Sequence, residues 1–168
     1  MRPALLASIT SLMARFAGGT KDRPATGETI FVAKDDPQIV AAIAQARETL
    51  PIFWRLCEAP PAGYSAFALN VALPATQGGA ESIWVVDVMR EADGACCGRL
   101  NRPRDLGSLQ GGSPVAFNDD QITDWQYEKG GKLYGHFASR AMMDRWNAAQ
   151  RAEGLEHFAP QPLEAGVQ

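Results

Sequence analysis

The chain has 168 residues, 46% of them hydrophobic and 21% charged, which is enough for one globular domain with an ordinary core. Its formal net charge of −3 excludes a global basic field for nucleic acid and leaves only local patches for that purpose. The three cysteines, two of them adjacent, do not form a disulfide framework, and no cysteine or histidine spacing matches a structural zinc site. We therefore predict no metal and no cofactor.

Residues 1–27 are predicted to form an amphipathic helix followed by a linker. The apolar positions of one helical face are Leu5, Leu6, Ile9, Leu12, Met13 and Phe16. The run is too short to span a membrane, so we predict a cytoplasmic protein with no transmembrane segment. The alternative is export of the chain, or attachment to a membrane surface, through residues 1–17.

A long helix is expected early in a single globular domain that covers residues 28–152. A short strand at 29–33 leads into it, and Asp36 and Pro37 suit its first turn. Its apolar stripe consists of Ile39, Ile43, Ala46, Leu50, Phe53 and Cys57. Pro51 interrupts the hydrogen-bond ladder, which predicts a kink or two abutting helices.

Short strands dominate the remainder of the domain. Alternation over 66–73 and apolar runs at 82–89, 95–100 and 113–117 predict strands, and Asp93-Gly94 predicts a hairpin turn. A one-turn helix after Asn118, a hairpin over 126–138, a closing helix near Met142 and a flexible tail at 153–168 follow. The pattern predicts an α+β fold with a mainly antiparallel sheet of about six strands, curled or forming a partly open small barrel.

Several segments occur in the order and spacing of a known bacterial family. They are Ala44–Phe53, Glu81–Val85, Gly98, Gly112–Phe117, Ile122–Trp125, Gly135 and Arg140. Over residues 41–140 the chain thus resembles DUF2314, a bacterial domain of unknown function. The sequence departs from the family pattern at Asn70 and at Ser113-Pro114. The resemblance implies a fold and brings no established reaction.

Two residues are candidates for catalysis, namely Asp124 and His136. If they faced each other, they would provide a base and an orienting carboxylate, with Cys96 or Cys97 as a nucleophile. The chain lacks a nucleophile signature such as G-x-S-x-G. The alternative is structural, with Asp124 paired to Arg140 or capping backbone amides.

Candidate binding residues are aromatic and basic, and consist of Arg102, Arg104, Trp125, Tyr127 and Tyr134. Aromatic side chains dominate binding hot spots, but they also fill cores. Together with Arg99, the two arginines form the one basic cluster, which favours at most a weak nucleic-acid patch.

The leading hypothesis is a small non-enzymatic module that binds another protein, with contacts in the glycine-containing loop between Asn101 and Gly112. It rests on the lack of metal, nucleophile and cofactor motifs. The alternatives are a hydrolase-like enzyme centred on His136 and Asp124, and a nucleic-acid-binding small barrel.

Overall fold

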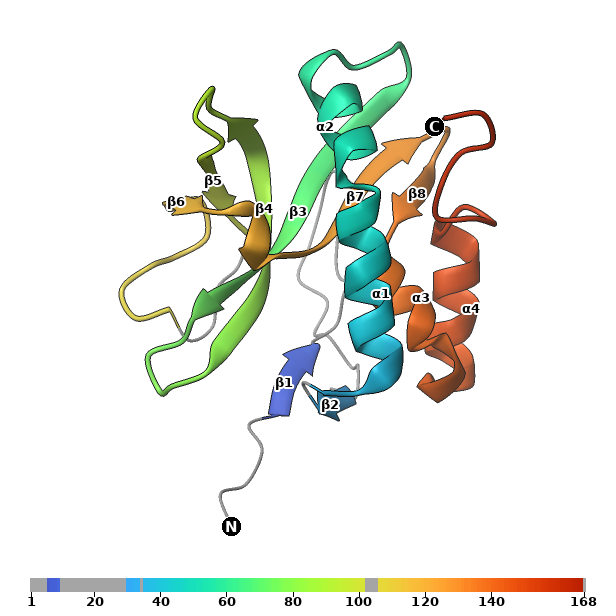
Figure 1. The fold of residues 1–168 in the computed structure, drawn as a ribbon. Coiled ribbons are helices and arrows are strands. Elements are labelled where there is room, and N and C mark those ends of the chain that lie inside the picture. The colour runs from blue at the N-terminus through green and yellow to red at the C-terminus, as the bar shows by residue number, and fades with distance from the viewer. Residues whose placement is uncertain (1–5, 10–29, 34, 102–105, 168) are drawn as a thin grey trace.

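Six strands form one antiparallel sheet in the computed structural model, which describes residues 6–9, 30–33, 35–101 and 106–167. They are β3 (Tyr64–Pro74), β4 (Ala80–Arg90), β5 (Cys96–Leu100), β6 (Pro114–Phe117), β7 (Ile122–Lys129) and β8 (Lys132–Gly135). Their spatial order is β6-β5-β4-β3-β7-β8, and every neighbouring pair is antiparallel (Figure 1). Because β6 and β8 do not pair, the sheet is open and the predicted barrel is wrong. The α+β class and the antiparallel sheet are confirmed.

Irregularities in β3 and β4 bend the sheet. The register shifts between Ser65 and Ala68 in β3, and between Val86 and Met89 in β4. Ala66 and Asp87 lie at these shifts with φ of 52° and 51°. Bulges of this kind increase local twist. The half of the sheet that contains β5 and β6 therefore turns away from the half that contains β7 and β8 (Figure 1).

The predicted single long helix is wrong, because the structure has two short abutting helices there, which is one of the two outcomes that Pro51 indicates. They are α1 (Pro37–Glu48) and α2 (Leu50–Glu58), separated by Thr49. Pro51 lacks an N–H and cannot continue α1, but it suits the first turn of α2. The Asp36 side chain accepts the Gln38 N–H at 2.9 Å and so caps α1, as the sequence indicates.

Three short helical segments follow the sheet, namely α3 (Phe137–Ala141), η2 (Met143–Arg145) and α4 (Ala148–His157). Asn147 and Gln150 form a capping box that begins α4. The helix predicted near Met142 therefore occurs later in the chain, as α4. The predicted tail, 153–168, begins inside α4, and its residues Phe158 and Ala159 are buried.

The N-terminal segment pairs with itself. β1 (Leu6–Ile9) and β2 (Ile30–Ala33) form a two-stranded antiparallel sheet, and β1 lies against β4. Leu6–Ile9 thus form a strand rather than part of the predicted helix. The rest of 1–27 lies outside the described residues, and the domain boundaries stay a prediction.

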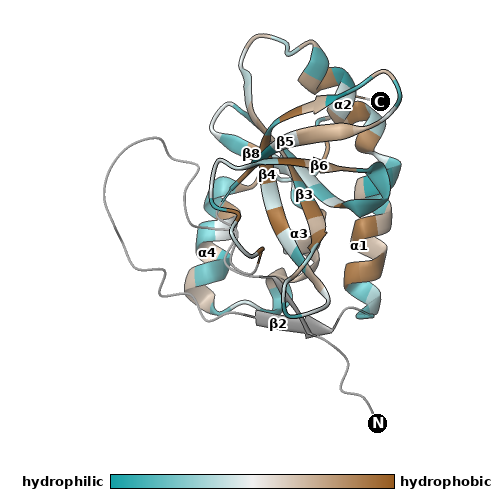
Figure 2. Ribbon diagram, turned by 90° about the vertical axis from the view of Figure 1, so that its left-hand side faces the viewer, coloured by the Kyte–Doolittle hydropathy of each residue, from teal (hydrophilic) through white to brown (hydrophobic). Residues whose placement is uncertain are grey.

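The main core lies between α1, α2 and the helix-facing side of the sheet. Phe53 of α2 packs against Trp125, with ring centroids 5.9 Å apart, and the Trp125 Nε1–H donates to the Ala46 carbonyl at 3.0 Å. In Figure 2 apolar residues of the strands lie at the centre, and hydrophilic residues lie on turns and outer helix surfaces. Burial of apolar side chains of this kind is the dominant favourable contribution to folding.

Candidate functional site

The carboxylate of Asp124 is buried and fully committed to backbone groups. It accepts the N–H groups of Trp125 at 2.8 Å, Phe137 at 3.0 Å and Ala138 at 2.9 Å. Burial raises the pKa of Asp124 to about 7, while the three N–H donors and the charge of Arg140 oppose that rise. The residue thus joins β7 to the first turn of α3.

Arg140 does not form an ion pair with Asp124. Its guanidinium donates to the carbonyls of Gly135 at 2.8 Å, Ala159 at 2.8 Å and Leu133 at 3.1 Å. It also lies over the Phe158 ring, 4.8 Å from the centroid. Of the two structural alternatives for Asp124, the structure therefore has amide capping. Arg140 instead holds the segment after α4 against β8.

His136 is buried between two aromatic rings. Its ring centroid is 5.0 Å from that of Trp84 and 4.9 Å from that of Phe158. Neither ring nitrogen has a hydrogen-bond partner among the described residues. Burial is the main cause that lowers the pKa of His136 to about 3, and the charge of Arg140 adds to it. The ring is therefore neutral near pH 7.

The structure does not bring Asp124 and His136 together as a catalytic pair. All hydrogen bonds of the described residues to the Asp124 carboxylate come from backbone N–H groups, and no carboxylate or thiol there bonds to the His136 ring. A general base needs its orienting partner within hydrogen-bond reach. This arrangement does not supply the geometry that the hydrolase-like hypothesis requires.

The predicted aromatic binding residues lie mostly in the core. Trp125 and Tyr127 are 0% exposed and stack on each other, with centroids 5.8 Å apart. Tyr134 is half-buried and stacks on Tyr127 at 5.1 Å. These rings support the fold on the helix side of the sheet. Arg102 and Arg104 lie outside the described residues, so their binding role stays a prediction.

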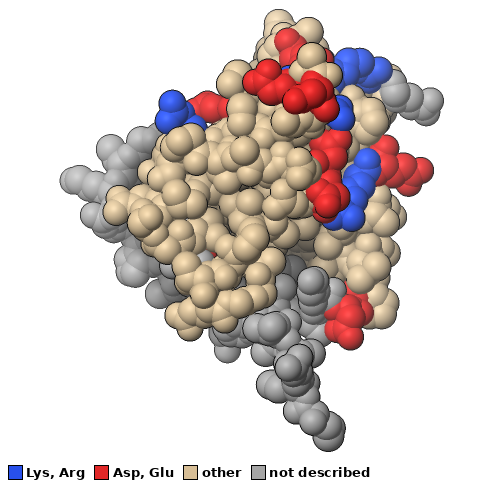
Figure 3. All heavy atoms as spheres, turned by 60° about the vertical axis from the view of Figure 1, so that its left-hand side comes forward, with Lys and Arg blue, Asp and Glu red and all other residues tan. Residues whose placement is uncertain are grey.

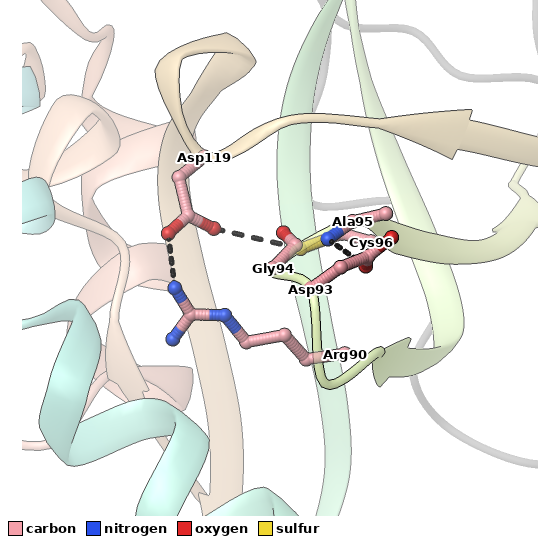
Figure 4. Close-up of polar contacts among 6 residues, drawn as sticks. All are labelled: Arg90, Asp93, Gly94, Ala95, Cys96 and Asp119. Atoms are coloured by element: carbon pink, nitrogen blue, oxygen red, sulfur yellow. Dashed lines mark hydrogen bonds and ion pairs between the residues drawn. The ribbon is translucent and has the colours of Figure 1, made fainter.

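A polar cluster joins the β4–β5 hairpin to the predicted one-turn helix, which the structure has as η1 (Asp119–Gln121) before β7 (Figure 4). Arg90 Nη2 lies 2.6 Å from Asp119 Oδ2, and the Cys96 thiol donates to Asp119 Oδ1 at 3.5 Å. Burial, with the hydrogen bond to Asp119, raises the pKa of Cys96 to about 11. The thiol thus stays protonated near pH 7 and makes a poor nucleophile. Cys97 is half-buried. Because adjacent strand residues point to opposite faces of the sheet, the Cys97 side chain lies on the face opposite to that of Cys96.

An uncharged surface lies on the outer side of β4, β5 and β6. Sequence reasoning pointed to the loop before Gly112 but missed the strand residues beside it. Met89, Cys97 and Ala116 are cross-strand neighbours, and Met89 is 60% exposed. Leu109, in the preceding loop, is 41% exposed. Residues 106–118 contain no Asp, Glu, Lys or Arg, and that run is the sequence signal for this surface.

Figure 3 looks toward this side of the molecule. It shows a broad area without charged side chains among the described residues, and charges gathered at its border. The tip of the β3–β4 hairpin lies beside it, because a Cβ added at Gly107 would be 3.2 Å from the Thr76 methyl group. Residues 59–80, which include that tip, also lack charged residues. The β3–β4 tip and the uncharged surface around β6 thus each come from a long uncharged run of the sequence.

Among the described residues no strand pairs with the outer side of β6, which is an open sheet edge within the uncharged surface. The Leu100 N–H donates to the Ser113 carbonyl at 2.9 Å, and the Leu100 carbonyl accepts the Gly112 N–H at 2.7 Å. These bonds determine which residues of β6 turn their backbone groups toward β5 and which turn them outward. In that alternation Val115 faces β5, and the backbone groups of Pro114 and Ala116 face outward. Proline lacks an N–H, so the outward groups are the two carbonyls and the Ala116 N–H. The opposite edge, β8, is covered, because Ala159 donates to Leu133 at 2.9 Å and Gly135 donates to Pro162 at 2.8 Å.

The fold and these surfaces define a small α+β domain with an open antiparallel sheet, of which the described residues cover one edge, β8, and leave the other, β6, free. Residues 36–158 match a family model described as "Uncharacterized protein conserved in bacteria (DUF2314)", so the chain belongs to the DUF2314 family. The match confirms the resemblance and extends it at both ends. No curated protein and no solved structure matches the chain significantly.

Two further observations bear on the candidate sites. Within the described ranges, no group of three or more His, Cys, Asp or Glu side chains is placed to hold a metal ion. None of the helices in that part of the chain has the length and apolar character that crossing a bilayer requires.

Proposed function

We propose that this DUF2314 domain is a non-enzymatic protein-binding module whose contact surface is the uncharged surface around β6. The observation that carries the proposal is the backbone edge at Pro114 and Ala116, which no strand of the described residues covers. An exposed strand edge is a template for an added strand, and many domains bind extended peptides in this way. The partner would present a short extended segment to Ala116.

The charge distribution favours a protein partner. Nucleic-acid binding depends on lysine and arginine contacts to phosphates, and residues 106–118 contain none. Arg99 is the β5 neighbour of Pro114 and lies on the same sheet face as Cys97, but its Nε already lies 3.8 Å from Asp87 Oδ2 in an ion pair. Exposed apolar groups such as Met89 and Leu109 are instead suited to an uncharged protein surface.

The length of β6 limits the contact. The strand has four residues, and Pro114 removes one of the outward donors. Proline on an edge strand is a common protection against unspecific strand pairing. The proposed partner therefore has to add side-chain contacts with Met89 and Leu109 to the few backbone hydrogen bonds.

Site-specific photo-crosslinking in bacterial cells tests the proposal. A p-benzoylphenylalanine at Ala116 or Leu109 is expected to give a discrete crosslinked protein band, and Met89→Arg is expected to abolish it. The matched control places the same crosslinker at Val40 of α1 or Leu155 of α4, which are also exposed and apolar. Equal crosslinking at the control positions, or none at Ala116 and Leu109, contradicts the proposed function.

A further inference from the structure

The chain after α4 returns toward β7 and β8 (Figure 1). Phe158 and Ala159 are buried, and the Ala159 N–H is bonded to β8. Residues 160–167, the strap, form no helix or strand, and they are exposed or half-buried. Leu163 and Val167 of the strap pack against the main core. The strap is therefore a surface segment that covers part of that core.

Little backbone pairing holds the strap on the sheet. Among the described residues, its backbone bond to β8 is the one from the Gly135 N–H to the Pro162 carbonyl, at 2.8 Å. Pro160 and Pro162 lack an N–H, so neither adds a donor to this edge. A segment with so few backbone bonds opens locally at a lower free energy than the sheet beneath it.

The strap carries a carboxylate that two side chains of the sheet hold. The Tyr64 hydroxyl donates to Glu164 Oε2, and Lys129 Nζ donates to Glu164 Oε1. Hydrogen bonds to Lys129 and to Tyr64 lower the pKa of Glu164, which is therefore ionised at neutral pH. Tyr64 and Lys129 are register partners in β3 and β7, and Lys129 Nζ lies 3.1 Å from the Tyr64 hydroxyl oxygen. The sheet thus positions both donors independently of the strap.

The chemistry of these contacts defines what the surface binds. Each donor takes a different oxygen of the Glu164 carboxylate, and one of the donors is charged, so the pair suits a carboxylate. The apolar Leu163, the residue before Glu164, packs against the core. The surface therefore fits an extended segment in which an acidic residue follows an apolar one. Such recognition combines a few backbone bonds with specific side-chain contacts.

The match to the family model separates this surface from its cover. The matched residues include β8, Tyr64 and Lys129, and they end at residue 158. The surface thus lies within the matched domain, whereas the strap lies outside it.

We propose that the strap is a displaceable cover over a binding surface for extended acidic peptides, in which a carboxylate of the peptide replaces that of Glu164 between Tyr64 and Lys129. Because the strap belongs to the same chain, it competes with a peptide at high effective concentration and lowers its apparent affinity. The surface is separate from the uncharged surface at β6, and the inference does not depend on the proposed function.

Amide hydrogen exchange of the ¹⁵N-labelled full chain, followed by NMR, measures the opening of the strap. The Gly135 N–H bonds to the strap, whereas the N–H of the next residue, His136, bonds to the Trp125 carbonyl at 3.0 Å. After correction for intrinsic rates, Gly135 is expected to exchange at least about tenfold faster than His136 in the wild type. Equal rates would mean that the strap opens only with the whole domain, and would overturn the proposal.

A charge reversal in the strap adds a second measurement. Glu164→Lys places a second cation beside Lys129 and is expected to speed exchange at Gly135 by about tenfold or more, with no change at His136. The control is Glu91→Lys, the same charge change at an exposed residue of the β4–β5 hairpin, which should alter neither rate. No effect of Glu164→Lys on Gly135 contradicts the proposal. The wild-type comparison needs no variant, so it decides even if Glu164→Lys does not fold.

A synthetic peptide with the sequence of residues 160–167 and blocked ends tests the binding surface. It is expected to bind Glu164→Lys in a saturable way and to slow the exchange of Gly135 in that variant. The same peptide with the change Glu164→Gln should bind at least about tenfold more weakly, because it lacks the charge that Lys129 pairs with. The wild type should bind the acidic peptide more weakly than the variant does. No binding to Glu164→Lys, or equal binding of the two peptides, overturns the proposal.

Discussion

The Asp124 carboxylate accepts the N–H of Phe137 at 3.0 Å, although thirteen positions and the β7–β8 hairpin separate the two residues. The same side chain accepts two more backbone N–H groups, so one carboxylate satisfies three buried donors. It fixes where α3 begins relative to the sheet.

Asp124→Ala is expected to lower the free energy of unfolding by about 3–5 kcal/mol, because it leaves buried N–H groups without acceptors. Asp124→Asn keeps an acceptor oxygen and should cost less, about 1–2 kcal/mol. Urea denaturation measures both values. Asp144→Ala is the control, since the Asp144 side chain is 94% exposed. A loss for Asp124→Ala no larger than that of the control would contradict this role.

Gly135→Ala is expected to prevent stable folding. An added Cβ would lie 2.0 Å from the Trp125 carbonyl oxygen, and φ is +77°. Neither the clash with backbone nor the left-handed conformation can relax locally. Gly130→Ala also has a positive φ but meets nothing within 4 Å, so its cost should be about 1 kcal/mol. Circular dichroism with thermal melting compares the two variants, and equal stabilities would contradict the close approach.

The stability that His136 contributes is expected to decrease in acid. Its folded pKa of about 3 lies below the ordinary value of 6.5, so the unfolded chain binds a proton that the folded protein excludes. The contribution is full above about pH 6.5 and is lost as the pH falls toward 3. The pKa of Asp124, raised to about 7, acts in the opposite direction, because its contribution is lost as the pH rises toward 7.

These two effects partly cancel in the wild type, so the measurement compares it with His136→Phe. The difference in unfolding free energy between the two proteins should change by on the order of 1.4 kcal/mol per pH unit between about pH 4 and pH 6.5, with the wild type losing more in acid. Urea denaturation across this range measures it. A difference that does not depend on pH would mean that His136 titrates normally.

Arg140→Lys is expected to lower the free energy of unfolding by about 1.5–3 kcal/mol despite keeping the charge. An ammonium group cannot reproduce the planar guanidinium that reaches the carbonyls of Leu133, Gly135 and Ala159. The segment after α4 should also become sensitive to limited proteolysis. Arg151→Lys is the control, because the contacts of Arg151 within the described part of the chain are all to nearby surface groups, namely the Met143 and Asp144 carbonyls and the Asp144 carboxylate at 4.0 Å. Unchanged proteolysis in Arg140→Lys would contradict the role of Arg140 in holding that segment.

The native protein is expected to react with a thiol reagent more slowly at Cys96 than at Cys97. Cys96 is buried and its pKa is raised to about 11, so little thiolate is present near neutral pH. Mass spectrometry after brief labelling locates the modified residue. Asp119→Asn removes the carboxylate beside the thiol and should speed the labelling of Cys96, while the reactivity of Cys97 stays unchanged. Faster labelling of Cys96 than of Cys97 in the wild type would contradict this account.

The sequence predicted the features that depend on local chemistry. Asp36 caps α1, Asn118 and Gln121 form the expected capping box, and Asp93-Gly94 lies in the turn between β4 and β5. The alternation over 66–73 correctly indicated β3. Each of these signals involves residues a few positions apart, so one sequence is sufficient to read them.

Features that depend on distant residues could not be predicted in this way. Whether the sheet closes depends on the bulges at Ala66 and Asp87, which carry no glycine to mark them. The sequence marks Asp124 as a structural or catalytic residue but does not reveal its bonding partners. The three N–H donors to its carboxylate come from two elements, β7 and α3. The free edge at β6 depends on strand order, which strand periodicity does not determine.

The two edges of the sheet have different consequences for self-association. The chain covers β8 with its own residues Phe158 and Ala159, so among the described residues β6 is the end strand of the six-stranded sheet to which a neighbouring copy can add a strand. Two copies that meet there use the same edge of each molecule and leave no further edge free. Edge-to-edge pairing of the six-stranded sheet, as the described residues form it, therefore ends at a dimer.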